Sequence, residues 1–390
     1  GSGKMPLPNY TDGSLVNLMS SLLEAMAGPA NGYLPLADLK PEEISSSQNI
    51  ILFVIDGLGY EYLLKNANDS FLSQYLRSPI TSVFPSTTAT AITSFMTGQA
   101  PQQHGLTAWH TYLKELGCIT AVLPFRPRVG SHTFDTAKIN ARQLYNHTSF
   151  FDLIQRPSYV VAPEWIIHSE FNEAHSGSAY LRGYDNLQQC FDYVSEVSQQ
   201  QEDQKYIYAY WPDFDRYSHE YGNASSKVAS HYEELCNQFE KLFNQLTGSN
   251  TSIIITADHG FVDIQPEDVI NLHDHPELEQ ALVLPLSGEP RVAYCYVNPD
   301  KEQQFVRYIE QHLADKLELI KSEQLIEQGY FGKGTPHPEL LNRIGHYALI
   351  MKDNYVIKDR LAGEQPFVHI GVHGGTSREE MLVPLIVAHL

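Results

Sequence analysis

Carboxylate and imidazole side chains recur in this sequence directly after short apolar segments. Six of them occupy such positions: Asp56, Asp215, His219, Asp258, His259 and His373. Carboxylate oxygens and imidazole nitrogens both bind divalent transition metals, and three of each exceed what one tetrahedral site can use. If the fold brings the six together, they fit two metal sites with mixed oxygen and nitrogen ligands.

Each of these residues taken alone has a simpler explanation. An aspartate such as Asp56 at the end of a strand commonly caps a turn or a helix. Asp215 and His219 are four residues apart and share one face if their segment is helical, but such a pair is often only a surface contact. The metal hypothesis therefore depends on the whole set rather than on any one member.

A second chemical feature is the stretch SVFPSTTATAITSFMTG, which begins at Ser82 and is crowded with hydroxyl side chains. Ser and Thr cap helices well and Pro85 suits the lead-in, so a helix start explains the composition. The alternative is that one of these hydroxyls is a nucleophile.

Apolar runs of strand length precede five of the candidate ligands, and another follows His373. We expect buried strands at 50–55, 206–211, 252–256 and 381–387, and a helix whose apolar positions run from Tyr232 to Leu246 and which closes at Gly248. Alternating strands and helices predict an α/β fold with a largely parallel central sheet and helices on both faces. Ligands bind at the carboxyl ends of the strands in such sheets, where the six side chains stand.

Residues 5–390 are expected to form one catalytic domain with two additions. The range 120–200 is expected to be a cap-like excursion that overhangs the site. The range 288–352 has a strand, helix, strand pattern and is expected to be a small inserted α+β subdomain.

Composition narrows the class of protein further. The chain has 390 residues, of which 42% are hydrophobic, and its formal net charge is −20, so we expect a globular protein that does not bind nucleic-acid polymers. It has no apolar run long enough to span a membrane, and its four cysteines form no CxxC pair. We expect a cytoplasmic location, with a trimmed or secreted native form as the alternative, and no membrane partner. The sequence sets no expectation for the oligomeric state.

Five motifs, in this order, resemble the alkaline phosphatase superfamily, in particular its nucleotide pyrophosphatase/phosphodiesterase branch: FVIDG, FPSTTATAITSFMTG, PDFDRYSHEYG, TADHG and VHGG. The resemblance extends from about Ile50 to Leu390. It implies an alkaline-phosphatase-like fold, two zinc ions, with manganese as the alternative, and a Thr or Ser nucleophile held on one ion. It also implies hydrolysis of a small phosphate ester or nucleotide through a covalent phospho-enzyme.

The resemblance also implies a role for each candidate. One metal would be bound by Asp56, Asp258, His259 and the nucleophile, and the second by Asp215, His219 and His373. The spacing of the family pattern places the nucleophile at Thr88, with Thr87 as the alternative. The diesterase pattern has an Asn three residues after the nucleophile, where this chain has Ala91, so a donor to a phosphate oxygen would come from elsewhere.

Other charged residues of the sequence have either a functional or a structural explanation. Arg126 and Arg128 lie between prolines after the nucleophile segment, where they suit either phosphate binding or an ion pair. His273 and His275 are expected to belong to an ordinary loop.

Because no basic residue occurs between Arg77 and Lys114, diesters or pyrophosphates are favoured over monoesters as substrates. A phosphomonoesterase, a phosphomutase and a catalytically idle binding protein are the alternatives.

Overall fold

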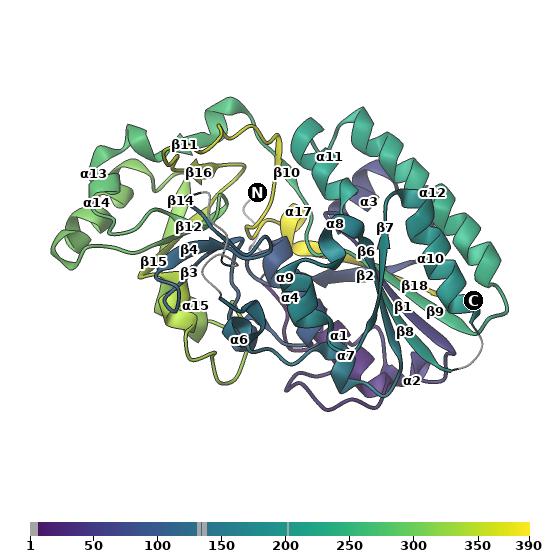
Figure 1. Ribbon diagram of the computed structural model, residues 1–390. Helices are drawn as coiled ribbons and strands as arrows, with labels where there is room; N and C mark the ends of the chain where they lie inside the picture. The colour runs from purple at the N-terminus through teal and green to yellow at the C-terminus, as the bar shows by residue number, and fades with distance from the viewer. Residues whose placement is uncertain (1–6, 131–133, 135–138, 201–202) are drawn as a thin grey trace.

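The computed structural model describes residues 7–130, 134, 139–200 and 203–390, and it contains two large β-sheets that lie side by side (Figure 1). The central sheet has seven strands in the order β2 (Leu76–Thr81), β18 (Leu382–His389), β9 (Thr251–Thr256), β1 (Asn49–Ile55), β8 (Lys205–Trp211), β6 (Ser158–Pro163) and β7 (Tyr180–Tyr184). The five strands from β9 to β7 are parallel, whereas β18 runs antiparallel to β9 and β2. The predicted largely parallel sheet is confirmed.

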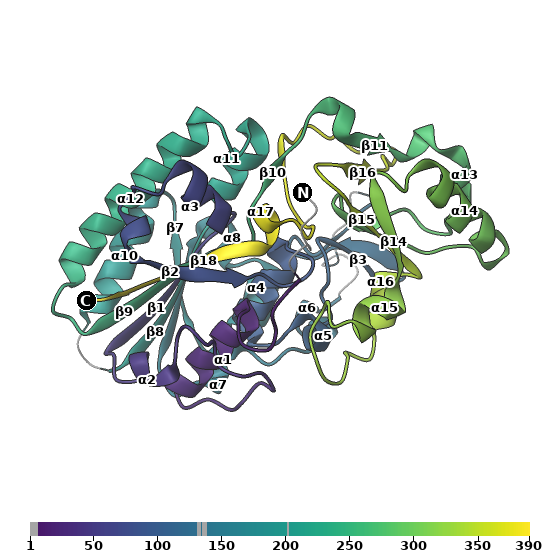
Figure 2. The same cartoon turned by 180° about the vertical axis from the view of Figure 1, so that it is seen from behind.

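The strands in the middle of this sheet form because their residues can be buried on both faces. Every residue of β1, β9 and the first five of β8 is buried, as expected for parallel strands that are covered by helices on both sides. Helices lie on opposite faces of the sheet in Figures 1 and 2: α10 (Leu187–Gln199) and α12 (Ser226–Leu246) on one, α1 (Leu15–Ala25) and α4 (Thr88–Thr97) on the other.

Helix α12 shows how the predicted periodicity positions a covering element. Its predicted apolar positions are all buried: Tyr232, Leu235, Cys236, Phe239, Leu242, Phe243 and Leu246. The helix ends at Leu246, two residues before the predicted Gly248, which adopts a positive φ of 85° in the following turn. The side chains of Phe53 in β1 and Phe239 in α12 meet edge to face at 4.9 Å between ring centroids.

The second sheet is antiparallel and also has seven strands. Their order is β14 (Leu317–Lys321), β15 (Tyr347–Met351), β13 (Val292–Cys295), β12 (Ser287–Glu289), β3 (His110–Leu113), β4 (Cys118–Ala121) and β5 (Arg126–Pro127). Helices α14 (Glu302–His312) and α15 (Ser322–Glu327) connect its later strands. Two small sheets, β10 (Val262–Asp263) with β17 (Gly371–Val372) and β11 (Val269–Asn271) with β16 (Val356–Lys358), complete the strands.

This arrangement changes the two expected additions. The later half of the range 120–200 does not overhang the site, because β6 and β7 extend the central sheet and α10 packs on it. Strand β7 escaped notice because it is a short edge strand with exposed positions. The range 288–352 does contain the predicted strand, helix, strand order, but its sheet continues through β3, β4 and β5. Residues 5–6, 131–133, 135–138 and 201–202 of the expected ranges lie outside the described residues.

Across the described ranges, no helix combines the length and the apolar character that crossing a bilayer would require.

Candidate active site

The register of three neighbouring strands brings the first candidate ligands to one edge of the central sheet. Strand β1 lies between β8 and β9, with Ile55 opposite Trp211 and Val54 opposite Thr256. Because the three strands are parallel, the residues that follow them emerge side by side. Asp56 therefore leaves the sheet next to the segment that leads to Asp258.

The turn after β1 requires glycine. Gly57 has a φ of +87°, and a Cβ atom there would lie 2.5 Å from the ring of Phe261. Its backbone N–H donates to Asp258 Oδ1 at 3.0 Å. This one hydrogen bond thus fixes both the path of the chain after β1 and the position of the Asp258 carboxylate.

The second pair of ligands lies on a helix, as its spacing suggested. Helix α11 (Asp213–Tyr221) follows β8, and Asp215 Oδ2 lies 3.4 Å from His219 Nε2. His373 reaches the same place from the loop after β17. Its Nε2 lies 3.6 Å from Asp215 Oδ1, and its ring stacks on that of His259 with 3.5 Å between centroids.

The six predicted ligands therefore form one cluster with two groups that could each hold a metal ion. Asp56, Asp258 and His259 form one group, in agreement with the predicted first site. The other group is Asp215, His259 and His373, so His259 stands close to both. His219 is absent from that compact trio, and it adjoins the trio through its contact with Asp215.

The histidines present the same nitrogen to the carboxylates. The Nδ1 atoms of His219, His259 and His373 contact the backbone carbonyls of Gly371, Gly260 and Ser86 at 2.8, 2.8 and 3.1 Å. A carbonyl oxygen only accepts, so each Nδ1 carries the hydrogen. Nε2 is then the atom that faces the cluster and would bind a metal ion, which is the usual arrangement for metal-binding histidines.

Two carboxylate oxygens in the cluster indicate that a cation belongs there. Asp215 Oδ1 and Asp258 Oδ2 are buried and have no hydrogen-bond partner among the described residues. Burial, and then the neighbouring Asp56, raise the pKa of Asp258 to about 8. Burial would lower the pKa of His259, but Asp258 and Asp56 raise it to about 10. Buried carboxylates this close repel one another, and bound divalent cations would relieve both the repulsion and the missing contacts.

Thr88 is the hydroxyl residue that faces this cluster. It is the first residue of α4, and its Oγ1 lies 3.2 Å from His259 Nε2 and 3.3 Å from Asp56 Oδ2. Thr87 occupies the N-cap position, yet its hydroxyl does not cap the helix. It donates instead to Glu289 Oε1 at 2.7 Å, away from the carboxylates. The structure thus separates the two adjacent threonines: Thr88 points to the cluster and Thr87 to the second sheet.

The remaining hydroxyls of this stretch have structural contacts. Ser86 donates to the carbonyl of Gly375, Thr93 to the carbonyl of Ala89, and Ser94 contacts His104 Nε2. Ala91 is fully buried, and its methyl side chain has no hydrogen-bond donor.

Two residues that sequence reasoning missed support the cluster. The hydroxyl of Tyr210, in β8, donates to Asp56 Oδ2 in a short hydrogen bond. Glu289, in β12, accepts from both Thr87 Oγ1 and the Trp109 N–H at 2.7 Å, and burial raises its pKa. The outward alternation of β8 could have indicated Tyr210, but Glu289 lies 202 residues from Thr87 and had no local signal.

The two candidate phosphate-binding arginines lie elsewhere. Arg128 forms ion pairs with Asp359 at 2.6 Å and Glu364 at 3.1 Å. Its charge is already matched, which corrects the expectation that it binds substrate phosphate. Arg126 is exposed at the end strand of the second sheet, away from the contacts of the cluster.

His273 and His275 remain outside the cluster, as expected. His273 Nδ1 contacts Glu279 Oε2 at 2.9 Å, and His275 contacts the hydroxyl of Tyr308.

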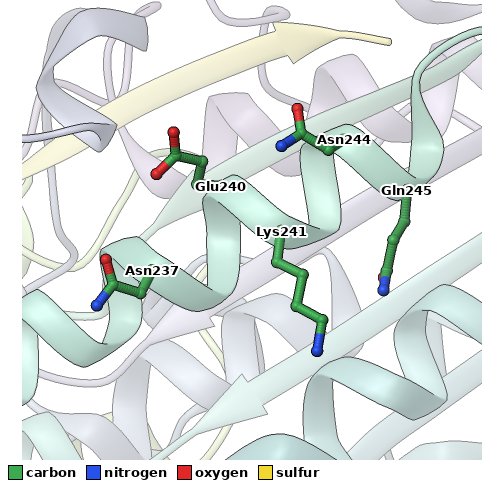
Figure 3. A pocket seen from close by; sticks show the side chains of 5 residues that line it. All are labelled: Asn237, Glu240, Lys241, Asn244 and Gln245. Atoms are coloured by element: carbon green, nitrogen blue, oxygen red, sulfur yellow. The ribbon is translucent and has the colours of Figure 1, made fainter.

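A shallow hollow on α12 also lies away from the cluster of candidate ligands. Figure 3 shows that it is lined by polar side chains of that one helix, Asn237, Glu240, Lys241, Asn244 and Gln245, all of which are exposed. It collects no catalytic residue types and indicates no site.

A family model described as type I phosphodiesterase / nucleotide pyrophosphatase matches residues 50–376. This span includes all six candidate ligands and Thr88. No curated protein matches the chain.

Solved structures show the same fold. Murine ectonucleotide pyrophosphatase / phosphodiesterase 5 is 16% identical with a TM-score of 0.63, over 86% of this chain and 87% of that one. The human protein of the same name is 17% identical with a TM-score of 0.62, over 87% of each chain. Phosphonoacetate hydrolase from Sinorhizobium meliloti 1021, in complex with phosphonoformate, is 18% identical with a TM-score of 0.60, over 86% of this chain and 89% of that one.

Proposed function

The chain belongs to the type I phosphodiesterase / nucleotide pyrophosphatase family, and on that premise we propose that it hydrolyses phosphodiester or pyrophosphate bonds in nucleotide-sized substrates with two divalent metal ions. Zinc is the expected metal, because the ligands combine imidazole with carboxylate. One observation carries the proposal: a threonine hydroxyl at a helix start contacts a buried cluster in which two carboxylate oxygens have no hydrogen-bond partner.

The proposed ligand sets follow from the contacts. Asp56, Asp258 and His259 would hold one ion beside Thr88, and Asp215, His219 and His373 would hold the other. When bound, such ions lower the pKa of a coordinated hydroxyl and neutralise charge on the transferring phosphoryl group.

This chain's own residues supply the remaining requirements. Thr88 Oγ1 attacks phosphorus and expels the alcohol or phosphate leaving group, which forms a phospho-threonine that still carries the other substituent of the substrate. Water then attacks the same phosphorus, frees Thr88 and releases that substituent as a phosphate monoester. The N-terminus of α4 carries the positive end of the helix dipole, so it stabilises the anionic phosphoryl group where Ala91 offers no donor. Tyr210 holds Asp56 in place, and the carbonyl contacts of the three histidines fix their tautomers.

The ligands of the solved relatives agree with this substrate range. An inactive variant of the murine protein was solved in complex with AMP, and the bacterial hydrolase with phosphonoformate. We favour diesters and pyrophosphates, because Arg128 is engaged in ion pairs and no basic residue occurs between Arg77 and Lys114. A phosphomonoesterase is the second candidate.

Paired threonine variants test the nucleophile. Thr88→Ala should lower kcat on bis-p-nitrophenyl phosphate by about 10³-fold or more, because a missing nucleophile removes the covalent route. Thr87→Ala, the matched control, should cost less than about tenfold, because it removes only a contact with Glu289. Acid-quenched enzyme should carry a p-nitrophenyl phosphoryl group on Thr88 by mass spectrometry, because one p-nitrophenol leaves when the adduct forms. Equal losses in the two variants, or the adduct on Thr87, would overturn the assignment.

Substrate preference is tested separately. The kcat/KM for bis-p-nitrophenyl phosphate and a dinucleotide should exceed that for p-nitrophenyl phosphate at matched pH and zinc. A monoester preference of about tenfold, or 1.4 kcal/mol in transition-state binding, would instead favour the phosphomonoesterase.

A further inference from the structure

A small pocket adjoins the proposed active site on the side of the second sheet. Five of the residues that line it carry ionisable side chains: His110, Arg128, Glu289, Lys358 and Asp359. Glu289 connects the pocket to the active site, because it accepts the hydrogen bond from Thr87, the residue before the proposed nucleophile. One hydrogen bond therefore separates the pocket wall from the residue that precedes the proposed nucleophile.

Most charges in the pocket wall are already matched. Arg128 donates to Asp359 Oδ1 at 2.6 Å and to both carboxylate oxygens of Glu364 at 3.1 and 3.2 Å. Its remaining terminal nitrogen donates to the carbonyl of Leu286 at 2.6 Å. The second oxygen of Asp359 accepts the Leu286 N–H at 2.8 Å. Arg128, Asp359 and Glu364 thus form a network in which each carboxylate oxygen already accepts at least one hydrogen bond.

Lys358 is the exception. Its side chain is half-buried, and its ammonium has no hydrogen-bond or ion-pair partner among the described residues. Its contact is the ring of Phe367, with Nζ 5.2 Å from the ring centroid. Burial, and then the charge of Arg128, lower the pKa of Lys358, whereas Asp359, Glu364 and Glu289 oppose this shift. A partly desolvated ammonium without an acceptor is costly, so an acceptor from outside the chain would stabilise it.

The ammonium also stands near the opposite side of the metal cluster. The ring of Phe367, which contacts the ammonium, lies 5.2 Å from the ring of His369 between centroids. The rings of His369 and His219 lie 4.3 Å apart. Lys358 is therefore close to the Glu289 and Thr87 contact on one side and to the surroundings of His219 on the other.

We propose that Lys358 binds a second anionic group of the substrate, a carboxylate or a further phosphoryl group next to the phosphoryl group that Thr88 attacks. This inference rests on the proposed function, because it takes the reacting phosphorus to be at Thr88. It narrows the substrate class to compounds with two neighbouring anionic groups, such as organic pyrophosphates and phosphonocarboxylates. The face of Phe367 covers the ammonium, so the anion approaches from the pocket.

Three phosphonates test this on the metal-loaded enzyme by isothermal titration calorimetry, at fixed free zinc. Phosphonoacetate carries a carboxylate, methylenediphosphonate carries a second phosphonate, and isobutylphosphonate has the shape of phosphonoacetate without its charge. At least one of the first two should bind the wild type about tenfold or more tightly than isobutylphosphonate, as expected for a charge-assisted hydrogen bond. The tighter of the two identifies the preferred anion.

Lysine variants localise the effect. Lys358→Gln should reduce the preference for the doubly anionic ligand to about twofold or less, while isobutylphosphonate binding is retained and reports a folded site. Lys358→Arg should retain part of the preference. Lys352→Gln is the matched control, because Lys352 lies on the same subdomain and is exposed, with its ammonium bonded to the carbonyl of Ala314.

The outcomes separate this inference from the proposed function. If the wild type shows no preference for the doubly anionic ligands, or if Lys358→Gln weakens all three ligands equally, Lys358 does not bind a second anion. If the wild type shows the preference but hydrolyses no phosphate ester, the proposed function fails and the anion site stands, because calorimetry does not require turnover.

Discussion

The carboxyl edge of the central sheet and the second sheet both collect buried charged side chains, but they pair them differently. Beside the second sheet, Arg291 in the turn between β12 and β13 forms a completely buried ion pair at 2.9 Å with Glu380 of helix α17 (Arg378–Met381), and Arg128 holds two carboxylates. At the edge of the central sheet, carboxylates crowd one another, and Asp215 Oδ1 and Asp258 Oδ2 have no hydrogen-bond partner among the described residues.

The difference separates charges that build the fold from charges that are arranged for a ligand. A buried ion pair with all its hydrogen bonds made is complete within the chain, whereas a buried carboxylate without a partner requires something from outside. By the same criterion Lys358 belongs with the active site, although it lies beside the matched charges of the second sheet. The predictions below test this division.

The largest expected effect is on stability and concerns the paired region. Arg291→Met should lower the free energy of unfolding by about 3–5 kcal/mol, because it leaves the buried Glu380 carboxylate without its cation. Chemical denaturation measures the change. Arg378→Met is the control: Arg378 is exposed and pairs with Glu61, so it should cost no more than about 1 kcal/mol. Similar losses in both variants would contradict the proposed role of the buried pair.

Substitution of a proposed metal ligand at the edge of the central sheet should have a smaller effect on stability but cause a large loss of activity. His219→Ala should remove one of the two metal ions and lower kcat/KM by more than the roughly 10–100-fold that is typical when an outer partner of a ligand is lost. His369→Ala is the matched control, because its ring lies 4.3 Å from that of His219 without belonging to the proposed ligands. It should keep both ions. Metal analysis of the purified variants measures how many ions each one retains. Loss of an ion in His369→Ala would revise the ligand set.

The smallest expected effect tests a supporting hydrogen bond. Tyr210→Phe removes the donor to Asp56 and keeps the ring, so metal affinity should fall by about tenfold with little change in unfolding free energy. A competition titration with a zinc chelator measures the affinity. Unchanged zinc affinity in Tyr210→Phe would show that Asp56 needs no support from this hydroxyl.

Sequence reasoning recovered four of the seven strands of the central sheet, β1, β8, β9 and β18, and the candidate ligands at its edge. The apolar segment that became β1 and the i,i+4 spacing on α11 are local signals, and the structure confirms both elements. The structure also brings the six predicted ligands and Thr88 into one cluster. It distinguishes Thr88 from Thr87, which spacing alone left as alternatives.

Local sequence patterns could not predict the second sheet or its charged contacts. Its strands come from two parts of the chain, and β12 joins β3 through the pairing of Gly288 with His110. Arg128 meets Asp359 across 231 residues, so its position between prolines gave no indication that its charge was matched. Glu289 and Lys358 likewise acquire their significance only from partners, or from the absence of partners, that are distant in sequence.

The central claim is that the crowded carboxylates and histidines at the edge of the central sheet bind two metal ions. Anomalous diffraction at the zinc edge, on crystals grown with zinc, tests it directly. The account predicts two peaks about 4 Å apart, one among Asp56, Thr88, Asp258 and His259 and the other among Asp215, His219 and His373. Chelation should then abolish activity. No more than one ion per chain, with full activity after chelator treatment, would contradict the account.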